Sequence, residues 1–338
     1  MLIDCQLLTY GATMNKDQVM TNEREEWLRE RKRGLGGTDV ACIVCSSADA
    51  SQKVGCFEKS EFALWADKTG IEVASDHRDN SAAFRGQMME DYVCKMYQHR
   101  LGDDVELVES GLLWHPKNKI IFGTPDRLVK KDGIEFGMDA KTRRFRKGWG
   151  PDGSTDIPLD VEIQMRVYME IVDAPYWDIA TLLGLDDLRI YRIERDKELG
   201  QKIMNLASEW WERHVVANEP PPADGSSKAK EVLSLMHPRP KPDVFMDATI
   251  KDKEMRDELT EIKKKQSELK ARRDLLENTL RAKIGDAVGI EGVATWKQNK
   301  PQQVFNKASF RKDNPDLYSN YVQEKPGIRV LRLIGVNK

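Results

Sequence analysis

Two short apolar runs, each leading into an aspartate, constrain the fold more than any other feature of the sequence. Residues 120–126 read Ile-Ile-Phe-Gly-Thr-Pro-Asp, and residues 134–141 read Ile-Glu-Phe-Gly-Met-Asp-Ala-Lys. Asp132-Gly133, between the two runs, is a dipeptide typical of a tight β-hairpin turn. The stretch therefore predicts two adjacent strands, each carrying an acidic side chain.

Asp126 would lie on the first of these strands, and Asp139 and Lys141 on the second. Side chains alternate between the two faces of a strand, so Asp139 and Lys141 should share a face. Two carboxylates and an ammonium would suit a divalent cation, with the lysine positioning or deprotonating a water. An Asp-x-Lys pair alone is also common on exposed strands. The preceding Thr-Pro-Asp favours the site.

Composition sets broad limits on the function. The chain has 338 residues, 40% of them hydrophobic and 33% charged, with a formal net charge of −2. Any contact with nucleic acid must therefore come from a local basic patch. We expect a cytoplasmic protein without a membrane segment or a signal peptide. The five cysteines lie in the first 94 residues, and the Cys42-x-x-Cys45 pair is interpreted as small core residues.

The chain is expected to have four parts. Residues 1–20 form a lead-in, residues 21–219 a nuclease-type domain and residues 220–249 a Pro-rich linker. Residues 250–338 form a C-terminal part with one long helix over 250–284 and a small β unit, with strands at 293–298 and 329–334. The helix has an approximate 4-3 apolar spacing, which favours a helical hairpin, a docking contact or an oligomer contact.

A basic helix and a glycine turn open the second part. A helix from Thr21 ends in Arg31-Lys32-Arg33, and Gly36-Gly37-Thr38-Asp39 reads as a tight turn with the N-cap of a second helix. Free N–H groups behind three cations make a plausible phosphate seat. The alternative is a capped helix behind a solvated basic turn.

A helix over residues 81–99 has an acidic residue beside its apolar stripe. The stripe comprises Phe84, Met88, Met89, Tyr92, Val93 and Met96. A carboxylate at Glu90, next to Met89, requires a partner if that face is packed. Glu90 either forms an ion pair with Arg85 or Lys95, or faces the Asp126 and Asp139 site.

Residues 142–150 are the densest basic stretch with interleaved aromatic residues. Arg143, Arg144 and Arg146 would grip phosphates, while Phe145 or Trp149 would stack on a base. The alternative is a solvated loop.

A helix over residues 158–172 follows, with Gln164 and Tyr168 one turn apart on one face. The alternative for this pair is a surface amide and a half-buried phenol. Strands at 176–183 and 188–193 and a helix at 198–216 complete the pattern: helix, three strands, helix, two strands, helix. This order favours an α/β (α+β) nuclease-type core over a doubly wound nucleotide fold, since the sequence has no Walker loop.

The chain resembles the YqaJ-type viral recombinases, a branch of the lambda-exonuclease-like PD-(D/E)XK nucleases, over roughly residues 24–216. Five motifs in order carry the resemblance: Trp27-Leu28 with Arg31 and Gly36-Gly37-Thr38-Asp39; Arg85-Gly86-x-x-x-Glu90; Thr124-Pro125-Asp126; Asp139-Ala140-Lys141; and Gln164-x-x-x-Tyr168. One departure is Asp139, where the family usually has Glu, so the carboxylate is one methylene shorter here. The implied fold is a restriction-endonuclease-like core with a central mixed sheet flanked by helices.

The resemblance also implies roles for the residues. Asp126, Asp139 and the carbonyl of Ala140 would hold Mg²⁺ or Mn²⁺, and Glu90 would share a second ion if one is present. Lys141, oriented by Gln164, would position the attacking water. Arg31 and Thr38 match positions near a 5′-phosphate seat. The DNA-binding residues expected are Arg31, Thr38, Arg143, Arg144, Arg146 and Tyr168.

The implied activity is 5′→3′ degradation of one strand of duplex DNA from 5′-phosphate ends. The product would be a 3′ overhang for a single-strand annealing protein, made by a trimeric ring encoded by a phage or prophage in a bacterial cell. Two alternatives remain open: a sequence- or structure-specific endonuclease, which would cut circular DNA, and a non-catalytic DNA-binding assembly protein.

Overall fold

A computed structural model of the chain describes residues 26–49, 51–56, 60–71, 81–102, 104–324, 327 and 329–334. The chain divides into two units, Met1–Met236 and His237–Lys338, and each is described by itself. The lead-in 1–20 and the cap proposed at Thr21 lie outside the described residues.

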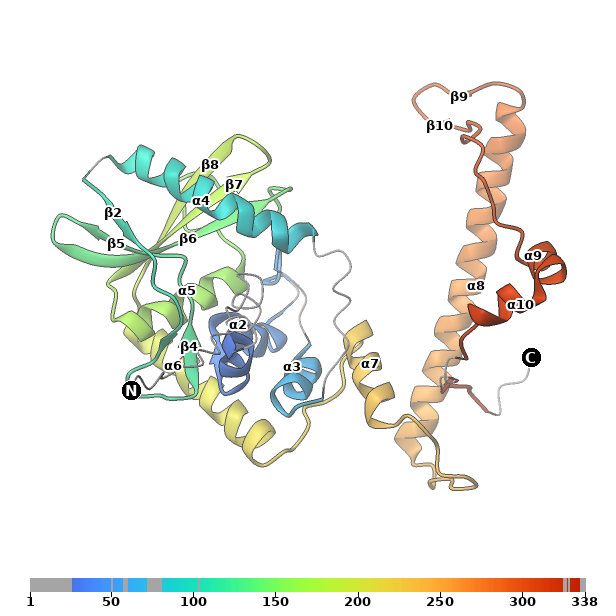
Figure 1. Cartoon of the computed structure of the whole chain (residues 1–338), viewed down its shortest axis with the longest axis horizontal. Helices are drawn as coiled ribbons and strands as arrows, with labels where there is room; N and C mark the ends of the chain where they lie inside the picture. Colours follow the sequence, from blue (N-terminus) through green and yellow to red (C-terminus); the bar gives the residue numbers. More distant parts are fainter. Residues whose placement is uncertain are drawn as a thin grey trace, which may run out of the picture. The chain divides into compact units, whose positions relative to one another are not determined.

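A five-stranded mixed sheet forms the centre of the first unit, in the order β2-β5-β6-β7-β8 (Figure 1). Its strands are β2 (Glu106–Val108), β5 (Arg127–Lys131), β6 (Ile134–Arg143), β7 (Tyr176–Leu183) and β8 (Asp187–Glu194). β6 and β7 run parallel, and the other neighbours are antiparallel. The expectation of a central mixed sheet is therefore confirmed.

The predicted hairpin forms between β5 and β6. Its turn residues Asp132 and Gly133 have φ angles of 51° and 76°, the left-handed conformation that a two-residue hairpin turn requires. Arg127 pairs with Met138 at the other end of the ladder. The turn thus fixes the register that brings Asp126 close to Asp139.

The sequence predicted that the first apolar run and Asp126 would lie on one strand. The described residues do not contain such a strand. The strand that the run does form, β4 (Ile121–Gly123), pairs with β1 (Leu35–Gly36) and β3 (Leu113–Trp114) in a separate three-stranded sheet. Asp126 lies in the junction between β4 and β5, just after Pro125, which has no N–H to donate to a ladder. Among the described residues, five strands, rather than the predicted three, therefore lie between the helix that begins at Ser81 and the helix that begins at Leu159.

Helices cover both faces of the central sheet (Figure 1). Helix α4 (Ser81–Leu101) packs on β6, β7 and β8. On the opposite face, α5 (Leu159–Val172) packs on β6 and β7 and contacts α2 (Gly37–Ser46). Because side chains alternate along β6, Met138 joins the core beneath α4. Asp139 and Lys141 project to the other face, toward α5.

Only part of the apolar stripe predicted on α4 is packed. Val93 is fully buried, but Phe84, Met88 and Tyr92 are 66%, 65% and 49% exposed. These three residues follow an i, i+4, i+8 pattern on one side of the helix. The sequence stripe thus merges a buried row with an exposed row.

Three further helices belong to the first unit, and the last of them was not predicted from the sequence. Helix α3 spans Glu61–Lys68 behind its Ser60 cap, and α6 (Lys197–Trp210) continues as a π-helix over Trp211–Val216. Helix α7 (Ser227–Met236) forms within the stretch predicted to be a linker. Its Ala229 and Val232 are fully buried in the core, so this half of the expected linker is part of the first unit.

The described cysteines are free thiols. Cys42 is buried, as predicted, and Cys45 is half-buried, with a pKa that burial raises to about 12. In the described part of the chain, no helix has the length and apolar character to cross a bilayer.

The second unit is built on α8 (Ile250–Ile284), whose bounds match the prediction. Thr249 caps it by accepting from Asp252 N. The chain then forms a hairpin of β9 (Gly289–Ile290) and β10 (Ala294–Thr295) and two short helices, α9 (Lys307–Asp313) and α10 (Pro315–Asn320). Residues 329–334 are not a strand, and the strand predicted at 293–298 is only two residues long.

Helix α8 has no second helix packed along its apolar residues within the described part of the unit. Met255, Leu259, Ile262, Leu269 and Leu276 are 39–69% exposed. The predicted helical hairpin is therefore not seen, and Ile284 is the buried residue of the helix.

Candidate active site

Asp126, Asp139 and Lys141 meet at the start of the β5–β6 hairpin. Asp126 Oδ2 accepts from Ala140 N at 2.9 Å, and Asp126 N donates to Asp139 Oδ1 at 3.4 Å. Lys141 Nζ donates to Asp139 Oδ2 and forms an ion pair with it. The structure thus brings together the three side chains that strand alternation predicted.

Burial governs the protonation of this group. Asp139 is 1% exposed, and its burial together with the nearby Asp126 carboxylate raises its pKa to about 7, although Lys141 acts in the opposite direction. For Lys141, burial acts to lower the pKa, but Asp139 and Asp126 outweigh burial and raise it. Lys141 is therefore a cation at neutral pH, which suits orienting a water better than deprotonating it.

Glu90 points toward this site but is held by a different residue from those predicted. Arg127 Nη1 donates to Glu90 Oε1 at 2.9 Å, and Arg127 Nη2 donates to Asp91 Oδ1 at 2.5 Å. Burial and then the Asp126 carboxylate raise the pKa of Glu90, which indicates that the two carboxylates lie near each other. Arg127, rather than Arg85 or Lys95, is thus the ion-pair partner.

The donor set fits a hard divalent cation. Among the described residues, no three His, Cys, Asp or Glu side chains form a ready-made metal-ligand group. The donors available to a cation are two carboxylates, those of Asp126 and Asp139, and one main-chain oxygen, the carbonyl of Ala140. Mg²⁺ is commonly held by one or two carboxylates and keeps several waters, so this small set fits it. The raised pKa of Asp139 also indicates two acidic groups in need of more positive charge.

Gln164 and Tyr168 support the site from inside the core, and neither is the surface residue of the alternative interpretation. Tyr168 is 4% exposed and accepts from Gln164 Nε2 at 2.9 Å, while its hydroxyl donates to Thr124 O at 3.4 Å. In the described chain Gln164 donates to Tyr168 rather than to Lys141. Tyr168 has no surface left with which to contact DNA, so its predicted role in DNA binding is corrected to positioning the segment before Asp126.

A cationic group lies beside the end of β4. The Arg31 guanidinium carbon is 4.5 Å from the Trp27 ring centroid and 5.6 Å from that of Phe122. Lys68 Nζ, on a side chain only 3% exposed, is 2.9 Å from Asp39 Oδ2 and donates to Arg31 O at 3.0 Å. Two cations thus flank the strand that leads into Asp126.

The N-terminus of α2 lies in the same region, since β1 pairs with β4 immediately before it. Gly36, not Thr38 or Asp39, is the N-cap, and Asp39 Oδ2 accepts from Gly36 N at 3.0 Å. The tight turn expected at Gly36-Gly37 is absent, because Gly36 belongs with Leu35 to strand β1 and Gly37 begins α2. Thr38 occupies the first turn of α2, as a phosphate seat requires.

The basic stretch after β6 divides into an inner part and an outer part. Trp149 is 6% exposed and packs against Tyr191, so it cannot stack on a base, as the sequence had allowed. Arg143 is half-buried, and burial lowers its pKa. Arg144, Phe145 and Arg146 are exposed, and Arg146 forms an ion pair with Asp187 at 2.8 Å.

Three residues near the site were given no role from the sequence: Arg127, Lys68 and Thr124. Thr124 Oγ1 is buried and has no hydrogen-bond partner among the described residues. A buried hydroxyl without a partner is unusual and costs free energy unless a ligand satisfies it. For Thr124, the Thr-Pro-Asp motif was the available sequence signal. Lys68 and Arg127 lacked such a signal, because their partners come from distant segments of the chain.

Comparisons with known proteins find similar sequences. The family model of the YqaJ-like viral recombinase domain matches residues 26–175. The uncharacterized protein YqaJ of Bacillus subtilis (strain 168) is 28% identical over 306 residues, which cover 89% of this chain and 91% of that protein.

Two solved structures are similar at lower identity. LHK-Exo in complex with dAMP, an alkaline exonuclease from Laribacter hongkongensis, has a TM-score of 0.43 and 19% identity over 57% of this chain and 93% of that chain. A phage-related exonuclease from Haemophilus somnus has a TM-score of 0.41 and 16% identity over 55% of this chain and 96% of that chain. In sequence, residues 26–175 of this chain are therefore similar to the YqaJ-like viral recombinase domain, and the Asp126, Asp139 and Lys141 group lies within the matched residues.

Proposed function

We propose that this protein is a metal-dependent exonuclease that degrades one strand of duplex DNA in the 5′→3′ direction. The observation that carries the proposal is the buried group of Asp126, Asp139 and Lys141, close to the cations around β4. A catalytic group next to a seat for a terminal phosphate would act on the first phosphodiester from a 5′ end. The remaining strand would then be a 3′ overhang, the substrate of a single-strand annealing protein.

The catalytic group would work as follows. Asp126, Asp139 and the carbonyl of Ala140 would hold Mg²⁺ or Mn²⁺, which supplies Lewis-acid stabilisation of the phosphodiester oxygens when bound. Lys141, kept cationic by its two carboxylate neighbours, would orient the attacking water and offset the negative charge that grows in the transition state. Arg127 would hold Glu90 beside Asp126, where it can join a second ion.

The seat for the 5′-phosphate would combine several donors. Arg31 and the first turn of α2, with Thr38, would face the phosphate, and Lys68 would fix the Arg31 backbone through its carbonyl. The Thr124 hydroxyl, which has no hydrogen-bond partner among the described residues, would lie between the phosphate seat and the metal ligands, two residues before Asp126. Arg144 and Arg146, which are exposed, would contact the DNA backbone beyond.

Linear and closed circular duplex DNA separate this proposal from its alternatives. Each substrate would be incubated with the protein and Mg²⁺, with and without EDTA, beside Lys141→Ala as the catalytic control. We expect metal-dependent loss of linear DNA only, and a rate at least about 100-fold lower for Lys141→Ala with DNA binding retained. Cutting of the circle would instead indicate an endonuclease, and binding without any cutting would indicate the assembly protein. Assembly into a trimeric ring, also proposed, would be tested by light scattering.

A further inference from the structure

The two units of the chain have opposite charge. Residues 237–338 contain 22 lysines and arginines against 15 aspartates and glutamates, whereas residues 1–236 contain 32 against 41. The near-neutral net charge of the whole chain conceals this asymmetry. A basic unit attached to an acidic one indicates a separate electrostatic role, such as attraction of a polyanion.

The positive charge gathers in one exposed segment, residues 295–312, here called the arm. No Asp or Glu occurs between Glu291 and Asp313. The arm carries five cations: Lys297, Lys300, Lys307, Arg311 and Lys312. Every residue from 295 to 309 is exposed, and residues 296–306 have no helix or strand.

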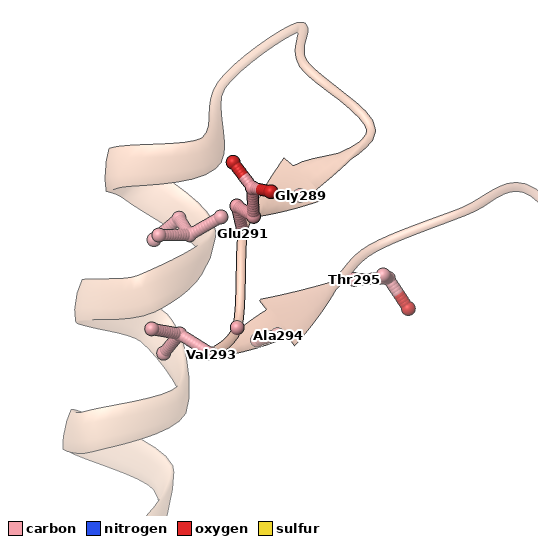
Figure 2. Close-up of a pocket in the computed structure, with 7 residues that line it drawn as sticks. Gly289, Glu291, Val293, Ala294 and Thr295 are labelled. Carbon is pink, nitrogen blue, oxygen red and sulfur yellow. The ribbon is translucent and has the colours of Figure 1, made fainter.

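Both ends of the arm are fixed to regular structure. At the start, Trp296 N donates to Val288 O at 2.9 Å, which ties the arm to the β9–β10 hairpin. Figure 2 shows the chain leaving this hairpin after Thr295. At the end, Asn306 caps α9 by accepting from Ser309 N at 3.0 Å. The part of the arm between these anchors, residues 296–306, is therefore tethered at both ends and loses less conformational entropy on binding than a free tail.

Aromatic and amide side chains lie between the cations of the arm. Trp296 is 52% exposed and Phe305 is 68% exposed. Four amides, Gln298, Asn299, Gln302 and Gln303, are also exposed. Further on, Lys307 and Arg311 lie over the Tyr318 ring at 5.6 and 5.5 Å.

We propose that the arm is a second nucleic-acid site, which binds single-stranded DNA independently of the metal site. Lysines on an extended segment match the phosphates of a strand, and exposed rings offer faces on which unpaired bases stack. A duplex keeps its base faces covered by stacking, so it would use the lysines and not the rings. An acidic protein would satisfy the lysines but would bring no planar bases for Trp296 and Phe305. In an exonuclease, such a site would hold the strand that is left undigested.

The test measures the affinity of the full chain for fluorescein-labelled oligothymidine of about 20 nucleotides in EDTA, by anisotropy at several salt concentrations. The aromatic variant is Trp296→Ala with Phe305→Ala, and the charge variant is Lys297→Gln with Lys300→Gln. The matched control is Lys263→Gln with Lys264→Gln, which removes the same charge from the exposed surface of α8. Circular dichroism checks that the helices of all variants are unchanged.

We expect the aromatic variant to bind roughly 25-fold more weakly, at a fivefold loss for each of the two stacked bases. The charge variant should lower the slope of log affinity against log salt by about 1.4, and the control should leave binding near the wild-type value. Equal weakening in the charge variant and the control would overturn the proposal, because net charge alone would then explain the binding. Wild-type affinity in the aromatic and charge variants would also overturn it, and would leave an acidic protein as the partner of the arm.

Cleavage of a short blunt duplex with Mg²⁺ separates this inference from the proposed function. The aromatic variant should keep wild-type cleavage of that duplex, because its substitutions lie outside the catalytic group. A chain that binds the oligonucleotide through the arm but cuts no DNA would refute the exonuclease and support the arm. A chain that cuts DNA but binds no single-stranded DNA in EDTA would support the exonuclease and refute the arm as a binding site.

Discussion

At the scale of single residues, Asp139 links metal binding to pH. Its pKa is raised from 3.8 to about 7 in the folded protein, so the folded state holds this proton more tightly than the unfolded chain. Without metal, the contribution of Asp139 to stability is therefore full below about pH 4 and is lost as the pH rises toward 7. A cation needs the ionised carboxylate, so proton and metal compete.

We predict that the affinity for Mn²⁺ falls about tenfold for each pH unit below the pKa of Asp139. The measurement is the metal-induced rise in Tm at about pH 6 and about pH 8, over a titration of Mn²⁺. Asp139→Asn should remove most of the rise at both pH values. Equal metal affinity at the two pH values in the wild-type protein would contradict the role of Asp139 as a ligand.

Arg31 gives the second prediction at this scale. Arg31→Ala should reduce cleavage of 5′-phosphorylated duplex by about 10- to 100-fold and change cleavage of 5′-hydroxyl duplex little, because a charge-assisted contact to the phosphate is lost. Arg33→Ala is the matched control, since Arg33 is exposed and pairs with Glu30. Parallel rate losses on the two substrates would argue against a phosphate seat at Arg31.

A site residue can be predicted from the sequence when its partner lies close to it along the chain. The convergence of Asp126, Asp139 and Lys141 followed from strand alternation and a turn dipeptide, both of which are local. The Lys68–Asp39 and Arg127–Glu90 pairs join helices and strands that only the tertiary fold brings together. A pattern along the chain holds no signal for such contacts, so Lys68 and Arg127 could not be assigned.

At the scale of elements, the crossing of α2 and α5 depends on a glycine. A Cβ at Gly37 would lie 2.9 Å from Tyr168 Cε1 and 3.1 Å from Gln164 Cγ. Gly37→Ala should therefore destabilise the protein by about 1–3 kcal/mol, since Tyr168 is packed and cannot move away freely. Gly86→Ala, in α4 with no atom within 4 Å of the new Cβ, should instead stabilise it by about 0.5–1 kcal/mol.

Chemical denaturation of the Gly37→Ala and Gly86→Ala variants measures both changes in the free energy of unfolding. A Gly37→Ala protein as stable as wild type would mean that α2 and α5 can separate at no cost. The seat formed by α2 would then not be held rigidly against Tyr168.

Element positions were easier to infer than their partners. Helices α4, α5 and α8 and strands β7 and β8 lie within a few residues of the predicted ranges, because caps and periodicity are local signals. The assignment of β4 and β5 to different sheets was missed, because pairing partners are not encoded in a strand's own pattern. The exposed row on α4 was missed for the same reason, since periodicity cannot tell which of two apolar rows is packed.

At the scale of the whole molecule, the chain joins an acidic nuclease-type unit to a basic unit with a long helix. The separation into two parts was visible in the sequence, from the Pro-rich segment and the capped helix after it. The extension of the first unit to Met236 was not, because Ala229 and Val232 give α7 only a short apolar face. For the whole molecule, the proposed activity is degradation of one strand of duplex DNA in the 5′→3′ direction.

The most direct test uses a linear blunt duplex with 5′-phosphates, labelled in one experiment at the 5′-terminal nucleotide and in another at the 3′-terminal nucleotide. With Mg²⁺, we predict early release of the 5′ label as mononucleotide, while the 3′ label stays on long single strands. Lys141→Ala should release neither label. Early release of the 3′ label, or release of both labels on internal fragments, would contradict a 5′→3′ exonuclease.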